Sequence, residues 1–244
     1  MRDCRDAHCH RAPIQRRVFW AAVLVLGLTQ GAAAQTAVDL QLALMVDASG
    51  SVNQYRFELQ KRGYVAALRN PRVLGAILGG RTQSIAISMV QWTGPFLQMV
   101  VLPWTLLKDE ASVMSAAGII EQTPRQLFGG GTSISGAIDY AMGMFPESPF
   151  KAERRVIDIS GDGSNNGGRS VVRARNEALE KGVTINGLPI LAVEPYLDQY
   201  YRDYVIGGPG AFMVVAKDFE SFGESILKKM IVEIAANEQR TPAR

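Results

Sequence analysis

Three oxygen-bearing side chains follow one another directly after an apolar run. The sequence from Leu42 to Gln54 reads LALMVDASGSVNQ, and Asp47, Ser49 and Ser51 occupy alternate positions where the apolar residues stop. A carboxylate and two hydroxyls at this spacing could form a serine nucleophile, a phosphate cradle, a metal site or only a polar turn. The remainder of the chain separates these four interpretations.

The first 34 residues predict an export signal. They contain Arg11, Arg16 and Arg17, then the apolar run VFWAAVLVLGL, then QGAAAQ. A basic segment, a short apolar stretch and an A-x-A site are typical of a secretory signal peptide. We therefore expect cleavage after Ala34, an exported protein that is periplasmic or secreted, and a mature chain that does not span a membrane.

Cleavage at this site would remove several reactive side chains. Both cysteines and both histidines lie in the segment, at Cys4, Cys9, His8 and His10. The mature chain then has no means to form a Ser-His-Asp triad, a cysteine nucleophile or the usual zinc site. It would keep 21 basic and 21 acidic residues, so it lacks the concentrated positive charge that nucleic acid binding requires.

Residues 35–237 alternate between strand and helix patterns, which predicts one α/β domain followed by a flexible tail at 238–244. The predicted strands are 39–46, 83–92, 96–102, 154–160, 183–191 and 211–216. The predicted helices are 54–69, 108–122, 133–145, 169–182, 194–205 and 218–237. Such alternation predicts a doubly wound, mostly parallel sheet with helices on both faces. The short turn at Thr93–Pro95 predicts one antiparallel edge strand.

Two more oxygen side chains stand at the ends of other predicted elements. Thr132 follows three glycines at the start of a helix, and Asp162 follows a strand. Because ligands of such sheets bind at the carboxyl ends of the strands, we expect these loops to converge with Asp47. Two carboxylates and three hydroxyls are hard oxygen ligands that suit Mg²⁺, with Mn²⁺ or Ca²⁺ as alternatives.

In this arrangement, Asp47-x-Ser49-x-Ser51, Thr132 in GGGTSISGAI and Asp162 in DISGDG resemble the metal-ion-dependent adhesion site of von Willebrand factor type A domains. The resemblance extends from about residue 39 to residue 236. It implies a doubly wound fold with a divalent ion at one end of the sheet. It also implies that the three hydroxyls contact the ion directly or through water, while the two carboxylates bind it or stand one water behind.

Two other segments, RRVIDISGDGSNN and YYRDYVIGGPGAF, resemble a secreted bacterial branch of the same superfamily. The resemblance to that branch implies the fold and the site, and it implies no particular ligand.

Each of these side chains also has a purely structural interpretation. The D-x-S-x-S pattern can be a polar turn, Thr132 can be a helix cap, and Asp162 can belong to an ordinary loop. Asp158, within an apolar strand, is interpreted as a buried structural acid rather than a ligand. The tyrosines at helical spacing are interpreted as core residues, with a binding rim as the alternative: Tyr196, Tyr200, Tyr201 and Tyr204. Trp92 and Trp104 are interpreted as core residues.

Two functions follow from these residues. The first is a metal-dependent protein-binding module, not an enzyme, in which an Asp or Glu carboxylate of a protein partner completes the coordination of the ion. The second is a metal-assisted hydrolase of phosphate or ester substrates, with Asp47 or Asp162 as base. No serine near the site has a histidine base, and the nearest arginine considered, Arg169, is not obviously placed at the site. These observations favour the protein-binding module.

Overall fold

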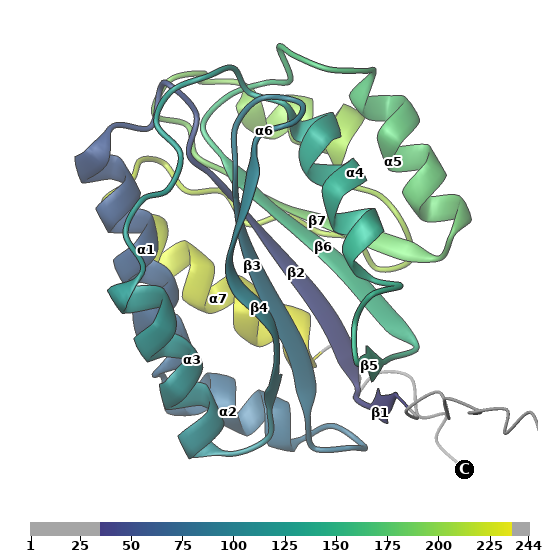
Figure 1. Ribbon diagram of the computed structural model, residues 1–244. Coiled ribbons are helices and arrows are strands. Elements are labelled where there is room, and N and C mark those ends of the chain that lie inside the picture. The colour runs from purple at the N-terminus through teal and green to yellow at the C-terminus, as the bar shows by residue number, and fades with distance from the viewer. Residues whose placement is uncertain (1–34, 236–244) are drawn as a thin grey trace, which may run out of the picture. The chain divides into compact units, whose positions relative to one another are not determined.

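The computed structural model describes residues 35–235, which fold around one five-stranded sheet (Figure 1). The strand order is β4-β3-β2-β6-β7. The strand bounds are β2 Leu40–Asp47, β3 Ile85–Trp92, β4 Gln98–Leu107, β6 Arg154–Gly161 and β7 Val183–Pro189. Neighbouring strands are parallel except β3 and β4, which are antiparallel and place β4 at the edge. The predicted α/β fold with one antiparallel edge strand is therefore confirmed. The predicted signal peptide and the tail at 238–244 lie outside the described residues.

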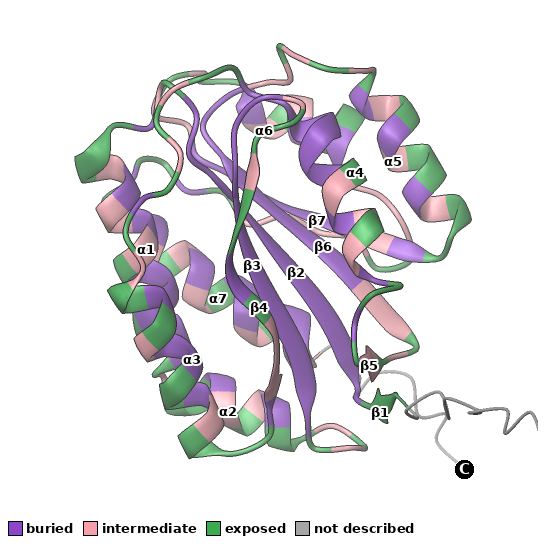
Figure 2. Ribbon diagram, in the orientation of Figure 1, coloured by how far each residue is buried: buried purple, intermediate pink, exposed green. Residues whose placement is uncertain are grey.

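Helices cover both faces of the sheet (Figure 1). The helices on one face are α1 Gln54–Leu68, α2 Pro71–Leu78, α3 Glu110–Gln122 and α7 Phe222–Ala235. The elements on the other face are α4 Ile134–Met144, α5 Val171–Glu180, α6 Leu197–Tyr200 and the π-helical turn η1 Tyr201–Val205. Figure 2 shows β2 and β3 buried throughout between these two layers.

The central strand β2 supplies side chains to both layers. Because successive side chains of a strand point to opposite faces, Leu42 and Leu44 pack in the core under α1 and α7, while Ala43 and Met45 pack in the core under α4 and α5. This two-sided burial explains why β2 is continuously apolar from Leu42 to Val46. The run stops at Asp47, where the strand ends; Asp47 is still buried, and Gln60 of α1 donates to its carbonyl at 3.1 Å.

One helix was not anticipated from the sequence. The dipeptide Asn70-Pro71 reads as a helix stop, and it does end the predicted helix at α1. However, the Asn70 side chain accepts a hydrogen bond from Arg72 N at 3.0 Å, and Pro71 occupies the first position of α2. Asparagine at the N-cap and proline at the first helical position are favourable at a helix start. The same two residues therefore end one helix and begin the next.

The predicted strand 211–216 is wrong. This segment lies beside β7 but makes only isolated bridges, Gly187 with Met213 and Ile190 with Ala216. Gly187 N donates to Phe212 O and Leu191 N donates to Ala216 O, whereas Pro189 between them has no N–H to donate to this segment. The missing donor interrupts the ladder, so the segment does not become a sixth strand of the sheet.

Smaller differences concern the ends of elements. The predicted helix 194–205 consists of α6 and η1, and the last helix begins at Phe222 rather than at Asp218. Asp218 accepts a hydrogen bond from Ser221 N at 2.7 Å in the turn before α7. A small parallel pair, β1 Thr36–Ala37 and β5 Phe150–Lys151, was not predicted. Within the described residues, no helix is long and apolar enough to cross a membrane.

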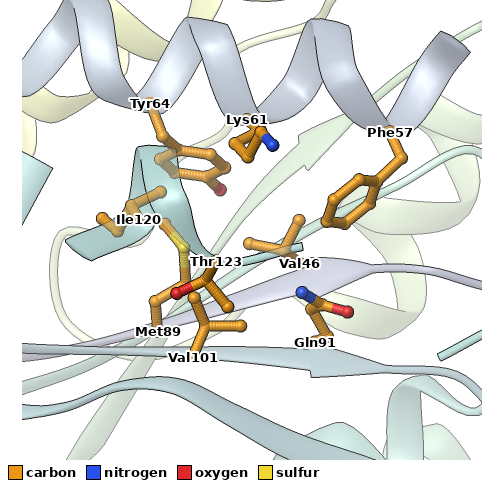
Figure 3. Close-up of a pocket in the computed structure, with 9 residues that line it drawn as sticks. All are labelled: Val46, Phe57, Lys61, Tyr64, Met89, Gln91, Val101, Ile120 and Thr123. Carbon is orange, nitrogen blue, oxygen red and sulfur yellow. The ribbon is translucent and has the colours of Figure 1, made fainter. Parts of the chain in front are cut away.

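The space between α1, α3 and the sheet contains a small cavity (Figure 3). Tyr64 and Phe57 of α1 lie across it from Met89 and Val101 of the sheet. Its volume is about 10 Å³, which is about the space that one water molecule needs. This cavity is a packing defect of the core and is too small to be a ligand site.

Candidate metal centre

Four of the five predicted site residues form one continuous chain of hydrogen bonds. Asp47 Oδ1 accepts from Ser49 N at 2.7 Å, and Ser49 Oγ lies 3.2 Å from Ser51 Oγ. Ser51 Oγ then donates to Asp162 Oδ1 at 2.5 Å. The structure therefore brings the ends of β2 and β6 together through these side chains.

The fifth residue, Thr132, lies in the loop that adjoins this chain. Its backbone N–H donates to Asn166 Oδ1 at 2.8 Å, and Asn166 N donates back to Thr132 O at 2.9 Å. These two bonds tie the start of α4 to the loop that follows Asp162. A Cβ added to Gly163 would lie 3.4 Å from Thr132 Oγ1, so the hydroxyl stands directly beside the backbone next to Asp162.

Glycines allow this close approach of backbones. Gly130 has a φ of +96°, which a residue with a side chain rarely adopts, and its carbonyl accepts a hydrogen bond from Gly50 N at 3.1 Å. At Gly161, an added Cβ would lie 2.8 Å from Asp47 Oδ2. Any larger residue there would push the Asp47 carboxylate away from the site.

The two carboxylates are fully buried, and their charge is only partly balanced. Burial raises the pKa of Asp47 to about 7, against hydrogen bonds from Ser49 that lower it. Burial also raises the pKa of Asp162, while the hydrogen bond from Ser51 and the charge of Arg56 lower it. Asp162 Oδ2 is buried and makes no hydrogen bond within the described chain. Such an atom needs a cation or a proton.

Two arginines reach this region, and sequence reasoning missed both. Arg56 Nη1 lies 3.6 Å from Asp162 Oδ2 and donates to Ser51 O at 2.7 Å. Arg125 is buried and donates to Ala48 O at 2.8 Å, so it supports the backbone of the turn. Arg56 is five residues after Ser51 in the sequence, and that proximity was the available signal. Arg125 had no such signal, because the fold alone brings it to the turn.

Arg169, considered from the sequence as an arginine near the site, forms ion pairs with other acids instead. Its Nη2 lies 2.6 Å from Asp139 Oδ1 and 2.7 Å from Glu177 Oε2. Asp158 is buried and lies 2.7 Å from Lys229 Nζ, which confirms its interpretation as a structural acid.

The aromatic residues divide between core and surface. Trp92 and Tyr201 are fully buried, so their assignment to the core is confirmed. Trp104 and Tyr200 are partly buried and pack against the core under α4 and α5. The core assignment is wrong for Tyr196 and Tyr204, which are exposed because α6 and η1 lie at the surface with one side facing solvent.

The donor set is chemically suited to a hard divalent cation. It offers two carboxylates and three hydroxyls, all oxygen ligands, as Mg²⁺ prefers. Within residues 35–235, no three His, Cys, Asp or Glu side chains gather in a way that could hold a metal. An ion at this end of the sheet would therefore rest largely on hydroxyl ligands and keep most of its positive charge.

The fold is shared with several solved structures. A von Willebrand factor type A structure from Catenulispora acidiphila matches with a TM-score of 0.57 and 16% identity, over 81% of this chain and 43% of that one. Proximal thread matrix protein 1 from the mussel byssus, in a structure with a zinc-occupied MIDAS motif, matches with a TM-score of 0.56 and 15% identity, over 83% and 47%. BatB from Bacteroides thetaiotaomicron matches with a TM-score of 0.53 and 19% identity, over 81% and 99%.

The chain spans about half the length of the mussel protein that it matches. At these identities the likeness establishes the fold. A search of curated proteins found no match. A family model matches residues 37–238, which is most of the sequence. The chain has the von Willebrand factor type A fold, and it belongs to the family described as "Protein of unknown function (DUF1194)".

Proposed function

We propose that this domain is an exported protein-binding module that depends on a divalent metal of the Mg²⁺ type. In this proposal the ion is held at the end of the sheet by Asp47, Ser49, Ser51, Thr132 and Asp162. A carboxylate of an Asp or Glu residue on a partner protein supplies a further ligand. Mn²⁺ and Ca²⁺ are the alternative ions.

One observation carries the proposal. Asp47, Ser49, Ser51 and Asp162 already contact one another in a single chain, and this chain ends at the buried, hydrogen-bond-free Asp162 Oδ2. Burying two acids side by side is costly unless a cation compensates them. A divalent ion bound there would offset both charges. The zinc-occupied MIDAS motif of the mussel protein of the same fold supports this assignment.

The charge count of the site explains why it would capture a carboxylate. Two carboxylates can at most neutralise a divalent ion, and the three hydroxyls add no charge. Arg56 adds a positive charge 3.6 Å from Asp162 Oδ2. The loaded site would therefore be neutral to positive and would attract an anion. A carboxylate is the anion that a protein surface supplies most readily, and its bond to the ion would be charge-assisted.

Export is part of the proposal and rests on the sequence of residues 1–34. Fractionation of expressing cells, with determination of the N-terminal residue of the product, tests it. We expect the product in the envelope or the medium, and we expect it to begin at Gln35.

Metal binding is tested by thermal and urea unfolding of the purified domain in Mg²⁺, Mn²⁺, Ca²⁺, Zn²⁺ or EDTA. At an ion concentration a hundredfold above its dissociation constant, binding should add about 2.7 kcal/mol to the free energy of unfolding. Asp162→Asn should abolish this gain. Asp203→Asn, which changes an exposed acid on η1, should preserve it. An unfolding midpoint that is the same in every ion and in EDTA would refute the metal site.

The hydrolase alternative is addressed with the same variants. Turnover of p-nitrophenyl phosphate or p-nitrophenyl acetate by the Mg²⁺-loaded domain, abolished in Asp162→Asn, would replace our proposal. We expect no turnover above that of the free ion, because the hydroxyls of Ser49 and Ser51 bond to each other and to Asp162, and within the described residues neither hydroxyl bonds to a nitrogen that could act as a base.

A further inference from the structure

Exposed aromatic side chains gather around the candidate metal centre. Within the described residues, the exposed aromatics are Tyr55, Phe96, Phe128, Tyr196 and Tyr204. Phe96 is 94% exposed, Phe128 and Tyr196 are 74% exposed, and Tyr55 is 62% exposed. All but Tyr204 stand on, or directly beside, the loops at the carboxyl end of the sheet. We call Tyr55, Phe96, Phe128 and Tyr196 the aromatic rim.

Hydrogen bonds show that the loops carrying the rim adjoin one another. Ser133 N donates to Thr93 O at 2.8 Å, which joins the loop of Phe128 to the hairpin of Phe96. Ser164 N donates to Glu194 Oε1 at 2.9 Å, which joins the loop of Asp162 to the loop of Tyr196.

The turn before Tyr55 is connected in the same way. Gly50 N donates to Gly130 O at 3.1 Å, and Ser51 Oγ donates to Asp162 Oδ1 at 2.5 Å. The rim residues therefore belong to one assembly of loops, which is the loop layer above the sheet in Figure 1. The candidate metal centre is part of the same assembly.

Several charged residues of these loops are paired with other groups of the protein. Arg125 donates to Ala48 O and Leu127 O, Arg169 pairs with Asp139 and Glu177, and Glu194 accepts from Ser164. The hairpin and edge strand from Thr93 to Leu107 contain no charged residue at all. Beside the two site acids, the hairpin and the aromatic rim therefore offer apolar and neutral side chains, and the partly exposed Arg56 is the cation next to Asp162.

One rim residue is held in place by the protein. The guanidinium of Arg125 lies 5.2 Å from the ring centroid of Phe128, and hydrogen bonds to Ala48 O and Leu127 O fix that guanidinium. A cation–π contact of this kind holds an exposed ring without burying it. Because the ring is held before any partner arrives, binding to it loses less conformational entropy.

We propose that the aromatic rim selects the partner: a protein segment in which one Asp or Glu is flanked by apolar or aromatic side chains. This inference rests on the proposed function, since the carboxylate is the ligand of the ion. The carboxylate of the partner's Asp or Glu binds the ion, and the side chains that flank this residue in the partner pack on the rings of the aromatic rim. The exposed Tyr and Phe rings match an apolar neighbourhood on the partner, and aromatic residues carry much of the energy of protein interfaces.

The test uses two synthetic pentapeptides with blocked ends and calorimetry in Mg²⁺. One peptide has aspartate between two pairs of leucine and phenylalanine, and the other has aspartate between glycines. The wild-type domain should bind the apolar peptide at least ten times more tightly. Phe96→Ser with Phe128→Ser should remove most of this preference and leave the affinity for Mg²⁺ alone unchanged. Tyr204→Ser, which changes an exposed aromatic outside the rim, should retain the preference.

Each contrary outcome has a distinct meaning. Mg²⁺ binding with equal affinity for both peptides overturns the role of the rim and leaves the metal site standing. Absence of Mg²⁺ binding overturns the proposed function and this inference with it. Retention of the preference in the double variant overturns the assignment to Phe96 and Phe128. Rim-dependent binding to phosphatidylcholine–phosphatidylglycerol vesicles, with no preference between the peptides, would overturn the protein partner in favour of a membrane surface.

Discussion

Asp158 lies within β6 and Asp162 directly follows the end of that strand, and the protein compensates the charges of these two acids differently. Asp158 is buried 2.7 Å from Lys229 Nζ, and Glu233 lies 3.2 Å from the same nitrogen. This internal cluster (Asp158, Lys229 and Glu233) thus contains a fully buried cation. Asp162 shares the site end with Asp47, and the cation beside it is Arg56, whose side chain is 31% exposed and stands 3.6 Å away.

The comparison shows where the structure is complete and where it needs an external group. In the internal cluster, a lysine on α7 stands between two acids, and Asn186 adds a hydrogen bond to Glu233 Oε1 at 2.6 Å. At the site end, the guanidinium of the buried Arg125 is engaged by the backbone carbonyls of Ala48 and Ser49, and the cation paired with Asp162 is the partly exposed Arg56 at 3.6 Å. β6 therefore carries one acid that is paired with a buried lysine within the sheet, and it is followed by a second acid whose ion pair is partly exposed, where a metal ion can enter.

The largest expected effect is on the internal cluster. Lys229→Met should lower the free energy of unfolding by about 3–5 kcal/mol, because it leaves buried carboxylates without their cation. Urea unfolding at pH 7 measures this loss. Lys228→Met, on the exposed side of the same helix, is the matched control and should change stability by less than about 0.5 kcal/mol. A small loss in Lys229→Met would show that the cluster is not held by its lysine.

At the site end, replacing an acid should raise the free energy of unfolding rather than lower it. Asp47→Asn, measured in EDTA at pH 8, should raise the free energy of unfolding by about 2 kcal/mol. The reason is that burial holds the pKa of Asp47 at about 7, well above its ordinary value, so ionisation in the folded state is costly. The same variant should lose the stabilisation by Mg²⁺. Destabilisation of the metal-free variant would contradict the view that the site has excess negative charge.

The pH dependence of the internal cluster should be visible in Asp158→Asn. Burial, with the charge of Glu233, raises the pKa of Asp158 to about 7 even though Lys229 lowers it. The folded state therefore holds a proton that the unfolded chain, with the ordinary pKa of 3.8, releases. This contribution to stability is full below about pH 4 and is lost as pH rises to 7.

Asparagine cannot lose that proton, so the stability of Asp158→Asn relative to wild type should rise by about 1 kcal/mol or more between pH 5 and pH 8. Urea unfolding in EDTA at each pH measures the difference. If the difference in unfolding free energy between Asp158→Asn and wild type stays constant over this range, the group that titrates is not Asp158.

The smallest expected effect concerns Arg56. Its guanidinium competes with a metal ion for Asp162 Oδ2, so Arg56→Met should increase the affinity for Mg²⁺ about fivefold, or roughly 1 kcal/mol for a partly exposed charge. Calorimetric titration with Mg²⁺ measures this change. Arg62→Met, an exposed position on the same helix, should leave the affinity unchanged. Weaker Mg²⁺ binding in Arg56→Met would mean that the arginine organises the site rather than competing with the ion.

Much of this organisation could be predicted from the sequence, because local signals carry it. Buried parallel strands require continuous apolar runs, and polar side chains at strand ends mark the edge where loops converge. Asp47, Ser49 and Ser51 could be grouped from their spacing alone, and Thr132 and Asp162 from their positions at element ends. The convergence of Asp47, Ser49, Ser51 and Asp162 is visible in their hydrogen bonds. Their role as metal ligands stays a prediction until an ion is measured.

Other features could not be predicted because the same residues are compatible with two different local structures. Asn70 and Pro71 are stop signals after one helix and start signals for another. Tyr200 and Tyr201 are adjacent, yet only Tyr201 is fully buried, since the face of a short helix that meets the core depends on where the helix is placed. Segment 211–216 does not form a strand because Pro189 lacks the N–H that would complete the ladder beside it.

The sequence by itself determined the alternation of the main strands and helices, the turn that follows Asp47 and the oxygen-only character of the candidate site. Only the tertiary structure decided which charges meet. Lys229 and Glu233 stand at helical spacing, yet nothing in the chain indicates that their helix would bring them against Asp158 rather than against solvent. Likewise, the packing of α1 placed Arg56 beside Asp162, while Arg169 turned to Asp139 and Glu177. Charge pairing acts over a few ångströms between residues that are distant in sequence, so the packing of the elements sets it.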